Sequence, residues 1–180
     1  MFIRSERLFL RPGWPEDWAE VYAGIADEGV VRNLARAPWP YRPENARSFL
    51  AASRGDDRYP CFLVTLASEG RVIGGIGLHL QDDRQVELGY WFARAHWGRG
   101  YATEAARVVV GLARTLGHCR LHAGRFVDNP ASGRVLVKAG FRPTGRIAPR
   151  ICVARGREVD SVEYAVDLTG CEAMSEKRAA

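Results

Sequence analysis

The sequence lacks the features that mark membrane-spanning and exported proteins. No apolar run approaches the roughly 20 residues that a membrane-spanning helix needs. Met1 leads within a few residues into a strand pattern, so we expect no signal peptide. We therefore expect no membrane partner and a cytoplasmic location.

Cysteine is scarce and dispersed. The chain holds four, which form no Cys-x-x-Cys pair and match no histidine spacing of a metal site: Cys61, Cys119, Cys152 and Cys171. The four histidines are equally scattered. These spacings predict reduced, mostly buried thiols, with neither a bound metal nor a disulfide framework.

The better-known phosphate-binding motifs are also missing. There is no Gly-x-x-x-x-Gly-Lys-Ser/Thr, and Gly75-Ile76-Gly77 lacks the third glycine and the helix that complete a dinucleotide-binding turn. The net charge of +5 is mild and spread along the chain. It indicates anionic partners such as phosphates and supports a nucleic-acid partner only weakly.

What is present is the composition of an ordinary globular protein, with 47% hydrophobic and 26% charged residues. A length of 180 residues suits one domain with a sizeable core. We expect that domain to cover residues 1–169, and residues 170–180 to form a loose C-terminal tail.

The stretch over residues 87–106 carries the strongest signal. It begins as a β-branched and aromatic strand, turns at Gly98 and Gly100, and continues as an alanine- and valine-rich helix. Glycines in such a turn let consecutive N–H groups converge where the helix dipole adds partial positive charge, which makes a binding site for phosphate. The alternative is that the glycines only permit a tight connection.

A family resemblance favours the phosphate site. The run Trp97-Gly98-Arg99-Gly100-Tyr101-Ala102 resembles the Arg/Gln-x-x-Gly-x-Gly/Ala signature of GCN5-related N-acetyltransferases (GNAT), with tryptophan at its first position. Residues 97–105 nearly reproduce Trp-Gly-Lys-Gly-Tyr-Ala-Thr-Glu-Ala, a run typical of the RimJ/RimL-like branch. The resemblance extends over residues 6–168 and implies acetyl-CoA as acetyl donor, bound as a coenzyme A thioester.

Periodicity and turn residues predict the order of the elements. Strands are expected at residues 6–11, 61–66, 72–80, 86–92, 120–127, 141–147 and 161–168. Helices are expected at residues 17–25, 44–53, 103–116 and 130–139, an irregular loop at 32–43, and a basic loop or hairpin at 148–160. This order gives an α/β (α+β) fold, a mixed and mostly antiparallel sheet. The resemblance implies a twisted sheet with helices on both faces, and strands 86–92 and 120–127 splayed apart.

Two residues are assigned catalytic roles by the resemblance. Glu87 is the candidate base that removes a proton from the acceptor's ammonium, directly or through water; the alternative is a solvated strand glutamate. Many relatives carry a tyrosine acid four residues before a Gly-Phe pair, but Leu136 stands there. Ser132 is the hydroxyl that we assign instead.

The resemblance also implies which residues hold the donor. Backbone N–H groups of Trp91, Phe92 and Ala93 would contact the thioester carbonyl and the pantetheine amides. In relatives, this strand ends in a bulge that frees such N–H groups from the sheet. The pyrophosphate would lie over the glycine turn, formed by Trp97, Gly98, Arg99, Gly100, Tyr101, Ala102 and Thr103. Glu104 would repel it and is expected to point away. Asn129 and Ser132 match the family's Asn-x-x-Ser, and Asn129 also suits a helix cap.

The resemblance also implies residues that bind the acceptor. Trp39 and Tyr41 lie in the loop that relatives use for substrate, although a hydrophobic lid over the first helices explains them equally well. Asp160 matches a recurring family aspartate, or serves a local turn.

The resulting hypothesis is an N-acetyltransferase acting by direct attack, because no cysteine lies in the motif region. The acceptor is a primary amine: the RimJ/RimL resemblance points to the N-terminal α-amino group of a protein, for example a ribosomal one, and a small molecule (polyamine, antibiotic or amino acid) is the alternative. A homodimer is compatible with this fold. A non-catalytic module that binds coenzyme A or RNA is the competing reading, and no metal is expected.

Overall fold

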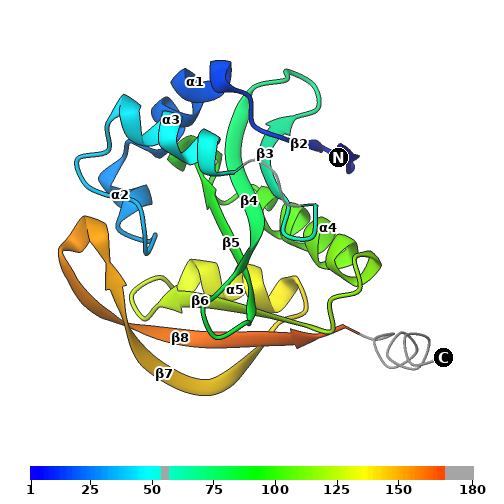
Figure 1. The fold of residues 1–180 in the computed structure, drawn as a ribbon, viewed down its shortest axis with the longest axis vertical. Coiled ribbons are helices and arrows are strands. Elements are labelled where there is room, and N and C mark those ends of the chain that lie inside the picture. The colour runs from blue at the N-terminus through cyan, green and yellow to red at the C-terminus, as the bar shows by residue number, and fades with distance from the viewer. Residues whose placement is uncertain (54–56, 169–180) are drawn as a thin grey trace.

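The computed structural model describes residues 1–53 and 57–168, which form one eight-stranded sheet with helices on both faces (Figure 1). The strands are β1 (Ile3–Arg4), β2 (Leu8–Arg11), β3 (Cys61–Leu66), β4 (Val72–Leu80), β5 (Val86–Phe92), β6 (Arg120–Phe126), β7 (Arg142–Cys152) and β8 (Arg157–Asp167). The helices are α1 (Trp18–Ile25), α2 (Glu28–Val31), α3 (Pro43–Ala52), α4 (Tyr101–Thr115) and α5 (Pro130–Lys138). The predicted α/β (α+β) class is confirmed.

The sheet opens at one place. Its order is β1-β2-β3-β4-β5-β6-β8-β7, and every neighbouring pair is antiparallel except β5 and β6. These two parallel strands pair at a single position, Glu87 opposite His122. Because they do not pair beyond it, β5 and β6 diverge toward Phe92. This is the splayed pair that the resemblance implied.

Strand alternation divides the core between the two faces of the sheet. Along β5, Leu88 and Phe92 pack in the larger cluster, with Val109 of α4 and Leu136 of α5. Trp91 points the opposite way and packs in the smaller cluster beneath α1 and α3. Glu87 shares Trp91's face, because the two are separated by four residues of one strand.

Helix ends confirm the expected stop and start signals. Gly117 and Gly140, just past α4 and α5, have φ angles of 80° and 100°, which glycine adopts without steric cost. Asn129 caps α5, since its side-chain oxygen accepts a hydrogen bond of 3.2 Å from the Ser132 N–H.

Several boundaries differ from the prediction. β1 and α2 were not predicted, because two and four residues are too short to show a period. The last two strands are longer than expected and pair from Arg142 to Cys152, so the basic segment 148–160 is a hairpin. Its end meets the segment after α2, where the Val153 N–H donates to the Ala35 carbonyl at 3.0 Å.

The cysteine prediction was partly wrong. Cys61 and Cys152 are free thiols, but Cys119, which directly precedes β6, is disulfide-bonded. Separation along the chain is no guide to separation in the fold, so spacing alone could not exclude the bond. The predicted tail at 170–180, with Cys171, lies outside the described residues.

Candidate active site

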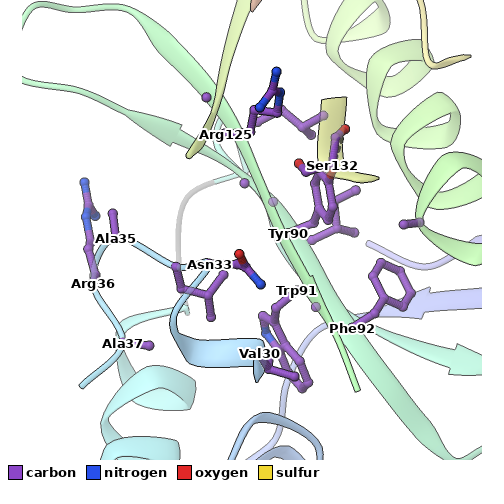
Figure 2. A pocket seen from close by; sticks show the side chains of 18 of the residues that line it. Val30, Asn33, Ala35, Arg36, Ala37, Tyr90, Trp91, Phe92, Arg125 and Ser132 are labelled. Atoms are coloured by element: carbon purple, nitrogen blue, oxygen red, sulfur yellow. Dashed lines mark hydrogen bonds between the residues drawn. The ribbon is translucent and has the colours of Figure 1, made fainter. Parts of the chain in front are cut away.

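A cavity of about 1040 Å³ opens where β5 and β6 diverge. Its wall is formed mainly by the segment between α2 and α3, α3, β4, β5, the glycine turn and β6 with α5, and Arg150 of β7 also contributes to it. Figure 2 shows this cavity, with Tyr90 beside Ser132 on one side of β5 and Trp91 toward Val30 on the other. The gap between β5 and β6 therefore connects the two faces of the sheet.

The glycine turn has the conformation that its residues predict. Gly98 and Gly100 have φ angles of 75° and 81°, and Gly100 precedes the first residue of α4. A side chain at Gly98 would meet nothing within 4 Å, so backbone conformation and not space requires glycine there. The Trp97 indole N–H donates to the Phe92 carbonyl at 2.7 Å and ties the turn to β5.

Glu104 points away from the turn, as expected. Its carboxylate accepts hydrogen bonds from the Arg7 N–H at 2.9 Å and from the Ser5 hydroxyl at 2.8 Å. The Arg7 guanidinium pairs with it at 2.7 Å and also donates to the Arg99 carbonyl at 3.1 Å. Burial works to raise the pKa of Glu104, but these hydrogen bonds and the guanidinium outweigh it and hold the pKa below its usual value.

Most of the predicted donor-binding residues line the cavity. These are Trp91, Phe92, Trp97, Gly98, Gly100, Tyr101, Ala102, Thr103, Asn129 and Ser132. Ala93 and Arg99 are not in its wall. β5 pairs with β4 from Val86 to Phe92 without a register shift, so the bulge found in relatives is not what frees its backbone groups. Divergence from β6 has that effect here.

Glu87 lies in the cavity wall and is paired with an arginine that the sequence did not single out. The Arg150 guanidinium donates to both carboxylate oxygens, at 2.6 and 2.9 Å. Gly124 makes room for this reach from β7 to β5, because a Cβ there would lie 3.0 Å from the Arg150 Nη1. The hydrogen bonds that Arg150 donates to the Glu87 carboxylate raise the pKa of Arg150.

Ser132 has a partner that sequence reasoning also missed. Its hydroxyl lies 2.7 Å from the hydroxyl of Tyr90, three residues beyond Glu87 and on the other face of β5. Burial raises the pKa of Tyr90 to about 12, so the phenol stays protonated near neutral pH. Leu136 is fully buried in the core, so a tyrosine reaches this site from β5 and not from α5.

The three residues predicted for the acceptor do not gather. Tyr41 is buried, with 6% of its surface exposed, and lines the cavity. Trp39 is 42% exposed, and neither it nor the exposed Asp160 is in the wall. Asp160 serves the fold through its carbonyl, which accepts from the Val127 N–H at 2.9 Å. Arg36, from the loop before α3, faces the cavity instead (Figure 2).

The described part of the chain offers neither a group of metal-binding side chains nor a membrane-spanning helix. Over residues 1–53 and 57–168, no three His, Cys, Asp or Glu side chains are grouped so that they could hold a metal ion. In the same ranges no helix combines the length and apolar character needed to cross a bilayer.

Comparison with known proteins defines the class. The family model described as "Acetyltransferase (GNAT) domain" matches residues 7–142, so the chain belongs to the GNAT family. "Probable N-acetyltransferase YjcK" of Bacillus subtilis is 39% identical over 155 residues, covering 79% of this chain and 84% of that protein. "Uncharacterized N-acetyltransferase YoaA" of the same organism is 28% identical over 176 residues, covering 91% and 95%.

Solved structures of acetyltransferases have the same fold. A GNAT-family acetyltransferase from Bacillus anthracis superposes with a TM-score of 0.80 at 26% identity, covering 93% of this chain and 98% of its own. The microcin C7 self-immunity acetyltransferase MccE, solved with acetyl-CoA and AMP, shares the fold at a TM-score of 0.75 and 17% identity, covering 91% and 93%. The protein is an acetyl-CoA-dependent N-acetyltransferase of this family.

Proposed function

We propose that this enzyme binds acetyl-CoA with its pyrophosphate on the glycine turn and transfers the acetyl group directly to a primary amine. The observation that carries the proposal is the joining of two features in one cavity. The turn with left-handed Gly98 and Gly100 stands at the N-terminus of α4, and the gap between β5 and β6 opens beside it. A helix start with free N–H groups suits a diphosphate, and the gap suits a narrow pantetheine arm.

Glu87 is the proposed base. An ammonium with a pKa near ~10 has no lone pair, so it must lose a proton before it can attack a carbonyl carbon. Glu87 lies on the face of β5 turned toward α1 and α3, and we place the acceptor on this side of the sheet. The proton passes to Glu87 directly or through water.

The hydroxyls of Tyr90 and Ser132 act on the other face. Acetyl-CoA supplies the acetyl group as a thioester, and the bond that breaks is the one between carbonyl carbon and sulfur. The departing sulfur takes one proton, and we propose Tyr90 as its donor, supported by its hydroxyl lying 2.7 Å from that of Ser132. The Ala93 N–H is bound to the Ile73 carbonyl at 2.9 Å, and the N–H of Trp91, two residues earlier on the strand, points to the same side. The Phe92 N–H, which points toward the gap beside β6, is therefore the group proposed to steady the carbonyl oxygen as it becomes negative.

For the acceptor, the RimJ/RimL-like run favours the α-amino group of a protein. Two solved structures are described as ribosomal-protein acetyltransferases, a putative serine enzyme from Vibrio cholerae and an S5-alanine enzyme from Vibrio fischeri. At 18% and 16% identity they share the fold alone. We also propose one catalytic domain over residues 1–169 and a cytoplasmic location; a small amine stays the alternative acceptor.

Release of thiol from acetyl-CoA tests the enzyme against a binding module. The protein is mixed with acetyl-CoA, with and without a mixture of α-amino acids, peptides and polyamines. Thiol release that depends on added amine, with one acetylated amine per thiol, supports the proposal. Tight binding of coenzyme A with no release under any of these conditions supports the module.

A further inference from the structure

The charge of the cavity does not suit a purely cationic acceptor. Among the described residues that line it, Glu87 is the single carboxylate, and both of its oxygens are held by Arg150. The same wall carries five basic side chains: Arg36, Arg125, Arg134, Lys138 and Arg150. An amine without other charge would meet a carboxylate that is already neutralised, in a basic surrounding.

The position of the pair shows that it is part of the site. Arg150 extends from β7 over Gly124 of β6 and Ser161 of β8 to reach Glu87 on β5. A Cβ at Gly124 would lie 3.0 Å from Arg150 Nη1 and 3.1 Å from Ser161 Oγ. The side chains are 33% and 16% exposed, for Arg150 and Glu87, so both can be reached from the cavity.

Arg36 adds positive charge near the same place. It donates to the side-chain oxygen of Gln81 at 3.3 Å, and both residues line the cavity. His79 stands opposite Glu87 in the register of β4 and β5. Gln81 directly follows β4, two residues beyond His79, so its hydrogen bond places the Arg36 guanidinium toward the Glu87 end of the cavity. Burial lowers the pKa of His79, and the Arg36 charge adds to this effect.

We propose that the acceptor carries a carboxylate beside its amine, and that Arg150 binds this carboxylate while Glu87 receives the ammonium. The inference rests on the proposed function and specifies its acceptor. Ammonium and carboxylate of an α-amino acid are roughly 3 Å apart, so a zwitterion matches a site whose own two charges are in contact. Each protein group exchanges one ionic partner for another, and neither charge is left without a partner.

This exchange also frees the base. While Arg150 donates a hydrogen bond to each oxygen of Glu87, the charge of the carboxylate is compensated by the guanidinium and not by an acceptor. A carboxylate on the acceptor competes for the guanidinium and releases Glu87 to take the ammonium proton. An amine that lacks the carboxylate leaves the ion pair closed. Arg150 is thus a specificity-determining residue for the reaction.

Matched acceptors test the inference by their kcat/KM in the thiol-release assay. One set compares several free α-amino acids with their carboxamides and with the corresponding decarboxylated amines. A second set compares peptides that begin with Asp and with Asn, which presents the same chemistry on a chain, and spermidine represents the polycations. We expect the carboxylate-bearing member of one set to exceed its neutral partner by roughly 10- to 100-fold.

Variants separate recognition from folding. Arg150→Gln is expected to lower kcat/KM for the preferred acceptor, mainly through KM, and to remove most of its advantage over the neutral partner. Arg150→Lys, which keeps the charge but loses the two-pronged contact, should retain part of it. Arg146→Gln is the matched control, because Arg146 is on the same strand and does not line the cavity. It should leave the preference unchanged.

The outcomes distinguish a failure of this inference from a failure of the proposed function. Equal use of acid and amide, a preference for spermidine, or an Arg150→Gln variant that slows all acceptors equally without unfolding would overturn the inference and leave the N-acetyltransferase intact. No turnover with any amine would overturn the proposed function itself. Preference for free amino acids or for the Asp peptide identifies which source of the carboxylate the cavity accepts.

Discussion

The hydroxyl groups of Tyr90 and Ser132 lie 2.7 Å apart and connect β5 to α5 beside the opening between β5 and β6. The contact places a phenol beside the cavity, although the position at which the resemblance implied a tyrosine holds the buried Leu136. Because Tyr90 and Glu87 are three residues apart on one strand, they face opposite sides of the sheet. The proposed base and the proposed proton donor are thereby separated by the gap in which we place the thioester.

We predict that Tyr90→Phe lowers kcat about tenfold or more and changes the KM for acetyl-CoA little, because the donor to the departing sulfur is lost. Steady-state thiol release measures both constants. Burial raises the pKa of Tyr90 to about 12, so its proton should remain available in wild-type enzyme up to about pH 11. Tyr22→Phe, on α1 and outside the cavity, is the control. A full kcat in Tyr90→Phe would assign Tyr90 to packing.

We predict that Glu87→Gln slows the reaction most near neutral pH. The deficit should shrink as pH rises toward ~10, where solution amine is already deprotonated and needs no base. A profile of kcat/KM between pH 7 and 10 measures this. Glu158→Gln, an exposed change on β8, is the control. An equal deficit at every pH would mean that Glu87 positions Arg150 and does not accept a proton.

We predict that Gly98→Ala and Gly100→Ala each raise the KM for acetyl-CoA. Both positions have positive φ, which costs a residue with a Cβ about 1 kcal/mol and moves the N–H groups that form the turn. Gly111→Ala is the matched control, because Gly111 lies within α4 with nothing within 4 Å of an added Cβ. It should leave KM unchanged and stabilise the helix by roughly 0.5–1 kcal/mol.

The parts of the fold that sequence predicted are those with a local signal. The meander β3–β4–β5, the glycine turn and the Asn129 cap were all legible, since alternation, glycine and capping residues act within a few positions. The register of β7 with β8 was not, because a single glycine among the basic residues there does not distinguish a loop from a long hairpin. Gly156, with a φ of 61°, sits at its tip.

The ion pair of the site was beyond sequence reasoning for a different reason. Glu87 and Arg150 are 63 positions apart and meet across β6 and β8, where Gly124 leaves room for the Arg150 side chain. The sequence around neither residue indicates that the two are in contact. The Tyr90–Ser132 contact likewise depends on how α5 packs beside β5. Long-range contacts of this kind follow from the assembled sheet and not from any window of sequence.

We predict that Glu104→Gln destabilises the protein by about 1–3 kcal/mol, because the Glu104 side chain is only 15% exposed and its partners, the half-buried Ser5 and the exposed Arg7, lose a charged acceptor. Because folding lowers the pKa of Glu104, its contribution to stability depends on pH. The contribution is present above the pKa of Glu104 in the unfolded chain and is lost as pH falls through its pKa in the folded protein. Urea unfolding at pH 7 and pH 3 measures both effects. Glu44→Gln, in the first turn of α3 with a distant Arg47 at 3.8 Å, should cost little.

We predict that Cys61→Ser flattens the loss of stability at alkaline pH. Burial raises the pKa of the Cys61 thiol to about 11 from 9.0. Between these values the unfolded chain loses the proton and the folded chain keeps it, so stability falls as pH rises. By pH 10.5 the thiol accounts for about 2 kcal/mol of that fall. Urea unfolding of the wild type and of Cys61→Ser between pH 8 and 10.5 measures this fall in stability. Cys152→Ser, which changes the other free thiol of the described residues, is the control. Parallel curves for wild type and Cys61→Ser would show that this thiol ionises as readily in the fold as in the unfolded chain.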